Sequence, residues 1–236
     1  MTRRTSAALM CAACAACTSL NSNDLATSGM SANMNVTADG TGQSRVSATL
    51  HVDNNATDYV NLTSGDSLTA TALSQTRTMA QNNVLGIVSY DASFSSADAS
   101  GTLYTIGLQR SKETSAPSSH CTLPSSFAIS APAPGAAYSR ANDAITVSYS
   151  NGGQPDPMSL SISGCISYTL PFSDTSPGSV TIAKGALQAG SSSATGSCEV
   201  TLTITRSRAG TLDPAFGSGG AITCQQVRSV TFTSTP

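Results

Sequence analysis

Hydrophobic and polar residues alternate along most of this chain, the period-two pattern that places every second side chain of a β-strand on one face. Met34, Val36 and Ala38 alternate with polar residues, and after a turn signal at Asp39 the alternation resumes over Val46–Val52. These two runs predict a hairpin with one buried face. Further strands are expected over Tyr59–Leu62, Leu68–Ala72, Val84–Phe94 and Leu103–Leu108.

The same alternation returns in the second half of the chain. It predicts strands over Ala144–Tyr149, Met158–Ile162, Val180–Ile182, Cys198–Ile204 and Val230–Phe232. Before the last of these, the glycine-rich segment Thr211–Gly220 predicts a hairpin loop with Phe216 packed on the core.

Together the two sets of strands predict an all-β protein with two immunoglobulin-like β-sandwich domains in tandem. We expect the first sandwich to span residues 30–110 and the second to span residues 125–236. Residues 111–124 are rich in Ser, Thr and Pro and break the alternation, which predicts an interdomain linker.

The N-terminal residues follow a different pattern. Arg3 and Arg4 precede a ten-residue apolar run, Ala7–Ala16, and Cys17 and a polar segment follow it. The run is about half as long as the roughly 20 apolar residues that a membrane-spanning helix needs. Its layout predicts a signal peptide over residues 1–16 and a polar tether over residues 17–29.

With Ala15 and Ala16 directly before Cys17, this segment resembles a bacterial lipoprotein signal, whose lipobox ends in a cysteine. The resemblance implies that the Cys17 thiol is lipidated, so that Cys17 becomes the first residue of the mature chain and anchors it to a membrane. Because Thr18 and Ser19 are not acidic, the resemblance favours the outer membrane, with the domains in the periplasm or at the cell surface.

Two other interpretations of the segment stay open. Cys14 is a second candidate for lipidation, although Cys11 would then stand where such signals usually have an aliphatic residue, as Cys14 does for Cys17. The segment also fits a plain secretory signal that is cut near Ala13–Ala15.

The cysteine count agrees with the lipid anchor. Of seven cysteines, two leave with the signal peptide and Cys17 carries the lipid. Four remain, an even number that predicts two disulfides in an exported protein. Four cysteines allow three pairings, of which we prefer Cys165–Cys198 and Cys121–Cys224. A metal site is less favoured because no Cys-x-x-Cys pair survives removal of the signal.

Charged residues make up only 10% of the chain, and the net charge is −2. This balance argues against nucleic acid as a partner. Arg206, Arg208 and Arg228 lie on strands that are expected to be neighbours, and could form a patch for an anionic glycan or a carboxylate. The alternative is an ordinary solvent-facing sheet surface with scattered charges.

Asp53, Asn55 and Asp58 have oxygen ligands at the alternating spacing that suits Ca²⁺. A turn rich in Asp and Asn, without a metal, explains the same residues. No other feature indicates a metal, and we expect no cofactor.

Catalytic motifs are absent from the sequence. His120 adjoins Cys121, but neighbouring side chains of an extended chain point apart, and a disulfide would consume the thiol. We therefore expect a non-catalytic, lipid-anchored envelope protein that acts in binding, adhesion or scaffolding, with a protein or a glycan as partner. A glycan-binding accessory module of a polysaccharide system and a hydrolase with an unrecognised site are the alternatives.

Mass spectrometry of the mature protein tests the anchor. We expect a chain that begins at Cys17 and carries the added mass of a lipid. A mature chain that retains an unmodified Cys17 would contradict lipidation there.

Overall fold

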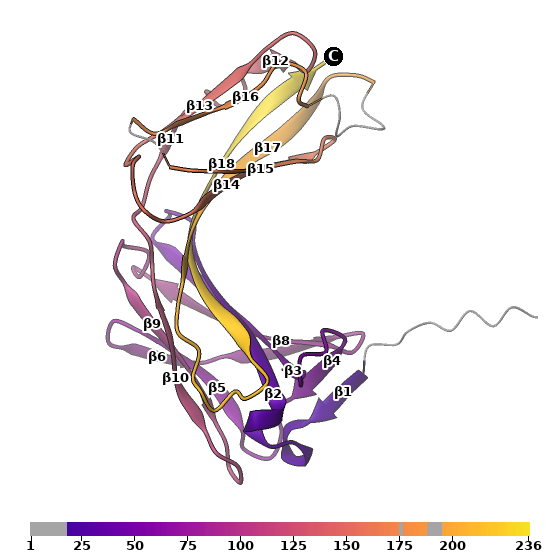
Figure 1. Ribbon diagram of the computed structural model, residues 1–236, viewed down its shortest axis with the longest axis vertical. Coiled ribbons are helices and arrows are strands. Elements are labelled where there is room, and N and C mark those ends of the chain that lie inside the picture. The colour runs from indigo at the N-terminus through magenta and orange to yellow at the C-terminus, as the bar shows by residue number, and fades with distance from the viewer. Residues whose placement is uncertain (1–17, 175–176, 188–194) are drawn as a thin grey trace, which may run out of the picture.

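The computed structural model describes residues 18–174, 177–187 and 195–236, so the expected signal peptide and Cys17 lie outside the described residues. The helices of this part are two three-residue 3₁₀ turns, η1 (Ser22–Asp24) and η2 (Thr27–Gly29); the other regular elements are strands (Figure 1). The all-β prediction is therefore confirmed. Among the described residues, no helix is long and apolar enough to cross a membrane.

A large mixed sheet of 11 strands contains strands from both halves of the chain. Eight of its strands follow one another in the order β1 (Thr18–Asn21), β4 (Asp58–Asn61), β3 (Gln43–Val52), β2 (Met30–Ala38), β18 (Gly220–Thr235), β17 (Cys198–Ala209), β14 (Met158–Gly164) and β15 (Tyr168–Phe172). Three more strands extend it: β12 (Ala137–Ser139) beside β18, β8 (Ile87–Ser95) beside β3, and β7 (Ala80–Val84) beside β8.

Two smaller sheets accompany the large one, one in each half of the chain. The four-stranded sheet has the order β10 (Ala116–Thr122), β9 (Leu103–Gln109), β5 (Ser67–Ala72) and β6 (Gln75–Thr78). The three-stranded sheet has the order β11 (Ile129–Ala131), β13 (Ile145–Tyr149) and β16 (Ser179–Ile182). A hydrophobic core fills the space between each small sheet and the large one.

The alternation seen in the sequence becomes burial in the strands. In β3, Val46, Ala48 and Leu50 are buried, whereas Arg45 is exposed. Full burial of a side chain the size of Val46 or Leu50 contributes about 1.5–3 kcal/mol relative to exposure. Phe216 of the expected hairpin loop is buried in the first core, as predicted.

One hairpin connects the two cores. β17 pairs with β18 along its whole length, and β18 continues over 16 residues, about 50 Å at the usual rise of a strand. Ile222 and Cys224 of β18 belong to the first core, and Phe232 of the same strand belongs to the second. The two sandwiches were expected to be separate, but the structure has two cores on one continuous sheet. The reason is that buried and outward-facing residues alternate without a break along β17 and β18, so the hairpin runs on from one core to the other.

The expected linker, residues 111–124, contains strand β10. Ala116, Ser119 and Cys121 are buried on its inner face, and β10 pairs with β9 in the first half. The inward positions are occupied by small or weakly hydrophobic residues. A period-two pattern of this kind is not visible among Ser, Thr and Pro, and the sequence-based prediction of a linker is wrong for this stretch.

Residues 18–29 do not form the expected tether. β1 pairs in parallel with β4, and the side chains of Ser22 and Thr27 are buried. The segment lies against the first half of the protein from its first described residue. The polar composition of the segment suggested a free tether, but an arginine distant in the sequence binds two of its backbone carbonyls.

That arginine is Arg110, which follows β9. Its Nε donates to Asp66 Oδ2 at 2.8 Å, and both side chains are only 1% exposed. Its Nη2 donates to the carbonyls of Ser22 and Leu25 at 2.7 and 2.9 Å. Burial works to raise the pKa of Asp66, but hydrogen bonds from Ser111 and Ser22 and the Arg110 guanidinium lower it below its ordinary value. The N-terminal segment is therefore held by a buried ion pair.

Arg110→Met tests this interaction. The substitution leaves the Asp66 carboxylate buried without its cation, which lowers the free energy of unfolding by about 3–5 kcal/mol. Urea unfolding followed by circular dichroism measures the change. The control is Arg45→Met, which removes the ion pair between Arg45 and Asp91. The Arg45 side chain is 67% exposed, so this substitution should lower the free energy of unfolding by less than about 1 kcal/mol. Equal losses of unfolding free energy in the two variants would show that the buried ion pair of Arg110 contributes no more stability than the exposed pair of Arg45.

Candidate functional site

Both expected disulfides are present, and they join the cysteines that the sequence analysis preferred. Cys121 of β10 is bonded to Cys224 of β18 across 103 residues, and connects the four-stranded sheet to the large sheet through the first core. Cys165, after β14, is bonded to Cys198 at the start of β17. Neither bond leaves a free thiol for chemistry.

Arg206, the first member of the expected anion patch, is fully buried. Its Nη2 donates to Asp174 Oδ2 at 2.6 Å and to the carbonyl of Asn151 at 2.8 Å, and its Nη1 donates to the carbonyl of Ser125 at 2.8 Å. This guanidinium connects three loops of the second half and cannot meet an external anion.

The other two arginines are also engaged. Arg208 forms an ion pair with Asp156 at 2.7 Å, and this hydrogen bond raises its pKa above the ordinary value. Arg228 donates to the carbonyl of Ala38, and its guanidinium lies over the ring of Phe127 at 5.5 Å. β17 and β18 are neighbours as expected, but the three side chains have internal partners, so the predicted anion patch does not form.

The candidate calcium residues form a turn. Asn55 Oδ1 accepts hydrogen bonds from the backbone N–H and the hydroxyl of Thr57, and Asn55 Nδ2 donates to Asp58 Oδ2 at 2.7 Å. Asp53 Oδ1 accepts from the Ser218 hydroxyl at 3.3 Å. Within the described ranges, no three His, Cys, Asp or Glu side chains gather in a group that could hold a metal ion. The geometry favours the Asx-rich turn.

The two histidines are also accounted for by local contacts. His51 is buried beside Tyr59, with ring centroids 4.7 Å apart, and this burial lowers its pKa. His120 is exposed, and its Nδ1 is hydrogen-bonded to the carbonyl of Ser118 at 2.9 Å. Its neighbour Cys121 is in a disulfide, so these two residues cannot form a nucleophile pair.

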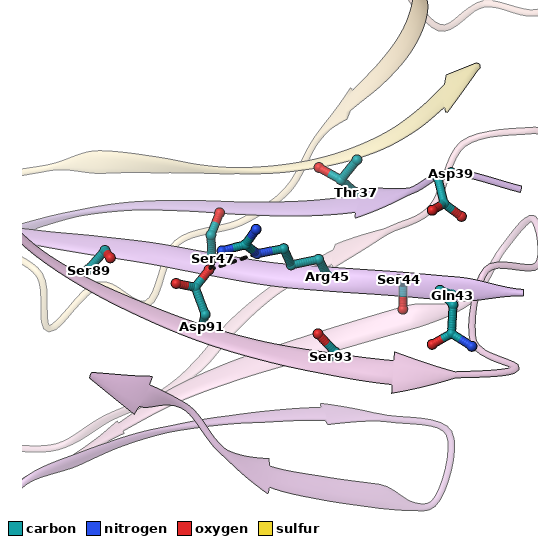
Figure 2. Close-up of a pocket in the computed structure, with 9 residues that line it drawn as sticks. All are labelled: Thr37, Asp39, Gln43, Ser44, Arg45, Ser47, Ser89, Asp91 and Ser93. Carbon is teal, nitrogen blue, oxygen red and sulfur yellow. Dashed lines mark hydrogen bonds and ion pairs between the residues drawn. The ribbon is translucent and has the colours of Figure 1, made fainter. Parts of the chain in front are cut away.

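An open groove lies on the face of the large sheet that is turned away from the four-stranded sheet (Figure 2). It has a volume of about 750 Å³. The groove runs over β2, β3 and β8 and the turn between β2 and β3, and is lined by Thr37, Asp39, Gln43, Ser44, Arg45, Ser47, Ser89, Asp91 and Ser93. Apart from Ser44, the lining strand residues are the polar partners in the alternation, so the pattern that buries the core also makes this face hydrophilic.

An ion pair lies at the centre of the groove (Figure 2). Arg45 Nε and Nη2 both donate to Asp91 Oδ1, at 3.0 and 2.8 Å, and Asp91 Oδ2 accepts from Asn82 Nδ2 at 3.0 Å. At the end of the groove, Asp39 Oδ1 accepts hydrogen bonds from the hydroxyl and the backbone N–H of Thr41, which lower the pKa of Asp39. Fixed charges therefore alternate with small hydroxyl groups along the surface.

A second hollow of about 300 Å³ continues this face onto β18. The continuity follows from the register, since Asn35 of β2 pairs with Ser47 of β3 on one side and with Thr223 of β18 on the other. Asn35 Nδ2 donates to Gln225 and Thr37, but Asn35 Oδ1 receives no hydrogen bond from any described residue. Water or a ligand is needed to satisfy this acceptor.

The hydrophobic and polar pattern of the sequence does not predict the groove. Arg45 and Asp91 are 46 residues apart, and only the pairing of β3 with β8 brings them together. One sign of a polar surface was present in the sequence. The outward positions of the strands over 43–52 and 87–95 include the cation Arg45, the anion Asp91 and several serines. That signal identifies a polar face, but it does not identify which faces become neighbours.

Asp174 gives a pH-dependent prediction. Burial works to raise its pKa, but hydrogen bonds from Tyr149 and the Gln154 backbone and the Arg206 charge lower it below the ordinary value. A carboxyl group with a lowered pKa in the folded state stabilises the fold above about pH 4 and loses this effect as the pH falls further.

Asp174→Asn should therefore cost about 3 kcal/mol or more of the free energy of unfolding at pH 7, since it leaves Arg206 buried without its anion. The difference from the wild type should narrow as the pH falls below about 4, because the wild-type protein then loses the stabilisation that the ionised Asp174 supplies. Urea unfolding at pH 7 and over a series of lower pH values measures it, with Asp91→Asn, at a pair whose arginine is exposed, as the control. A difference that does not depend on pH would contradict the ionic role of Asp174.

The sequence matches no protein-family model and no curated protein. Solved structures match at low similarity. The two immunoglobulin domains of DIP-gamma are 8% identical, with 86% of this chain and 98% of that chain covered and a TM-score of 0.25. A 1.5-MDa bacterial ice-binding adhesin is 12% identical, with 87% and 65% covered and a TM-score of 0.24. The Bacteroides ovatus protein SGBP-B, solved with a mixed-linkage heptasaccharide, is 13% identical, with 82% and 54% covered and a TM-score of 0.23. TM-scores this low establish neither a fold family nor a function.

Proposed function

We propose that this protein is a non-catalytic binding protein of the bacterial cell envelope, anchored by a lipid on Cys17, and that it binds a glycan in the groove over β2, β3 and β8. The observation that carries the proposal is the groove itself, an open polar surface of about 750 Å³ with the Arg45–Asp91 pair at its centre. Each half of the fold is proposed to be immunoglobulin-like, which the layering of two sheets around each core supports.

Location in the envelope is supported by the sequence and by the disulfides. The residues before Cys17 resemble a lipoprotein signal, and removal of that signal together with lipidation leaves four cysteines. All four are paired in the structure. Disulfides of this kind persist in oxidising compartments such as the periplasm or the cell surface. The outer membrane is the membrane that Thr18 and Ser19 favour.

A glycan suits the chemistry of the groove. Sugar hydroxyl groups both donate and accept hydrogen bonds, and the groove offers carboxylate acceptors, a guanidinium donor and serine hydroxyls that do both. Charged groups form stronger hydrogen bonds than neutral ones. The open shape admits a chain that passes across the strands, and the second hollow over β2 and β18 extends the contact surface. Asn35 Oδ1, which has no donor among the described residues, lies along this extension.

A binding role suits the groove better than hydrolysis. General acid catalysis needs a group that holds a proton near the working pH. The pKa of Asp39 is lowered by hydrogen bonds from Thr41, and the carboxylate of Asp91 is paired with Arg45. Both carboxylates are therefore arranged to accept hydrogen bonds as anions.

Affinity electrophoresis tests the proposal, with dextran, mannan or alginate cast into native gels. The wild-type protein should be retarded by at least one polymer. Asp91→Asn and Arg45→Met should each weaken this binding about tenfold or more, because a hydrogen bond to a charged group contributes about 1.5–3 kcal/mol.

The control for these variants is Lys112→Met, which removes an exposed cation in the loop between β9 and β10 and should leave the retardation unchanged. Retardation that the two groove variants do not alter would exclude the groove as the binding site. Lack of retardation by every polymer, with capture of an envelope protein instead, would replace the glycan with a protein partner.

A further inference from the structure

Exposed hydrophobic side chains gather at one hairpin tip. The turn between β7 and β8 has the sequence Val84-Leu85-Gly86-Ile87. Val84 is 65% exposed, Leu85 is 93% exposed and Ile87 is 46% exposed. These three are half of the six large hydrophobic residues that are exposed in the described part of the chain. Nothing in the described chain covers this tip.

The turn residues make the tip costly for the folded chain alone. Leu85 has φ 53° and Gly86 has φ 86°, so the two-residue turn has two positive φ angles in succession. Such turns strongly prefer Asn-Gly, Asp-Gly or Gly-Gly, because a branched side chain is disfavoured in the left-handed region. A leucine at this position is both strained and exposed to water. Strain at Leu85 together with three exposed hydrophobic side chains in one turn points to a role outside the chain's own core, and the turn at Leu73 lacks this cluster.

The sheet register places this tip beside the start of the described chain. β1 runs parallel to β4, and β8 and β4 are both antiparallel to β3, so β1, β4 and β8 begin at the same end of the sheet (Figure 1). The Tyr90 hydroxyl donates to the carbonyl of Val60 and accepts from the backbone N–H of Leu62, so it lies opposite Asn61 of β4. Asn61 in turn pairs with Asn21 of β1.

Ile87 is three residues before Tyr90 in β8, and Asp58 and Thr18 are three residues before Asn61 and Asn21 in β4 and β1. A strand rises by about the same length per residue in each of these elements. A second connection supports the alignment, since Gln81 of β7 donates to Asn61 of β4, which donates to Asn21 of β1. β1 thus begins, at Thr18, at the end of the sheet where the hairpin tip lies.

The loop between β3 and β4, at this end of the sheet, is mostly polar, and its charged residues are acidic. Residues 53–57, between β3 and β4, are exposed, and Asp53 and Asp58 are the charged residues in or beside this loop. Neither this loop nor residues 84–87 contain Lys or Arg. Attraction to an anionic lipid surface therefore does not come from these two loops, and of the two the apolar tip is the one that can insert into a bilayer.

From this geometry we propose that the β7–β8 tip inserts into the lipid interface beside the anchor, which makes it a second membrane contact. The inference rests on the proposed lipid anchor at Cys17. The occupant is a phospholipid bilayer, because a chain anchored at residue 17 brings the tip to the membrane surface. A single anchoring point leaves the protein free to turn, whereas two points fix the sheet relative to the membrane.

The chain contains no tryptophan, so Leu85→Trp introduces a single fluorescent reporter at the tip. The chain from Cys17 onwards is coupled through that thiol to a maleimide phospholipid, since the other four cysteines are in disulfides. It is then incorporated into vesicles of phosphatidylethanolamine and phosphatidylglycerol. Emission of the L85W protein should shift to shorter wavelength on the vesicles and be quenched by nitroxide-labelled lipids.

Leu73→Trp is the matched control. Leu73 is also an exposed leucine in a turn, 64% exposed with φ 54°, but it lies beside Ser100 and Gly101, beyond the opposite end of β8. Its emission should not change on vesicles. As a second measurement, Leu85→Ser in a protein coupled to one acyl chain should speed transfer between vesicles about tenfold, since one chain holds a protein only reversibly.

Unchanged emission of the L85W protein on vesicles, or an equal shift in the L73W protein, would overturn the proposal. A shift that grows with protein concentration in the absence of vesicles would assign the tip to a second copy of the chain. Because the anchor is made chemically, a negative result concerns the tip alone. Natural lipidation is decided separately, by the mass of the mature N-terminus.

Discussion

The continuous pairing of β17 with β18 is the constraint on which the rest of the structure depends. β18 contributes Ile222 to one core and Phe232 to the other, and it also pairs with β2 and β12. Neither core can close without the same strand. The two halves are therefore expected to share their stability, and a lesion in β18 weakens both. A tandem of independent domains would lack this coupling.

Charged side chains are few in this protein, but several of them pack at the junction between its two halves. Between the two cores, Arg206 and Arg228 both lie over the ring of Phe127, at 5.1 and 5.5 Å. Gln226 of β18 is fully buried, and its side-chain amide donates to the carbonyl of Asp98. The junction between the halves is thus a polar layer in which the Arg228 and Gln226 side chains are hydrogen-bonded and Arg206 Nε has no partner among the described residues. Directional hydrogen bonds of this kind favour one arrangement of the hairpin more strictly than an apolar contact would.

Most of the expected strands, the number of disulfides and the burial of Phe216 followed from the sequence, because alternation and cysteine parity are local or countable properties. Parity does not decide among the three possible pairings, and the strand expected over Val84–Phe94 is interrupted by the turn between β7 and β8. The structure departs from expectation where the deciding partner is remote. Arg110 holds residues that lie 85 to 88 positions earlier, and Asp174 removes Arg206 from the surface. The groove was missed for the same reason, since Arg45 and Asp91 become neighbours only through strand pairing. Composition alone misled in residues 18–29 and in β10, where small polar residues are buried.

The attachment of Ser22 and Leu25 to Arg110 has a consequence for the order of events in maturation. Only four residues separate Cys17 from Ser22, and β1 already begins at Thr18. An enzyme that cuts before residue 17 must bind the backbone on both sides of the cut, and the pairing of Thr18 with Asp58 of β4 leaves that backbone bound to the sheet instead. On the proposed route, processing therefore precedes the docking of β1 onto β4. This edge strand would then join the sheet only after the chain has reached the membrane.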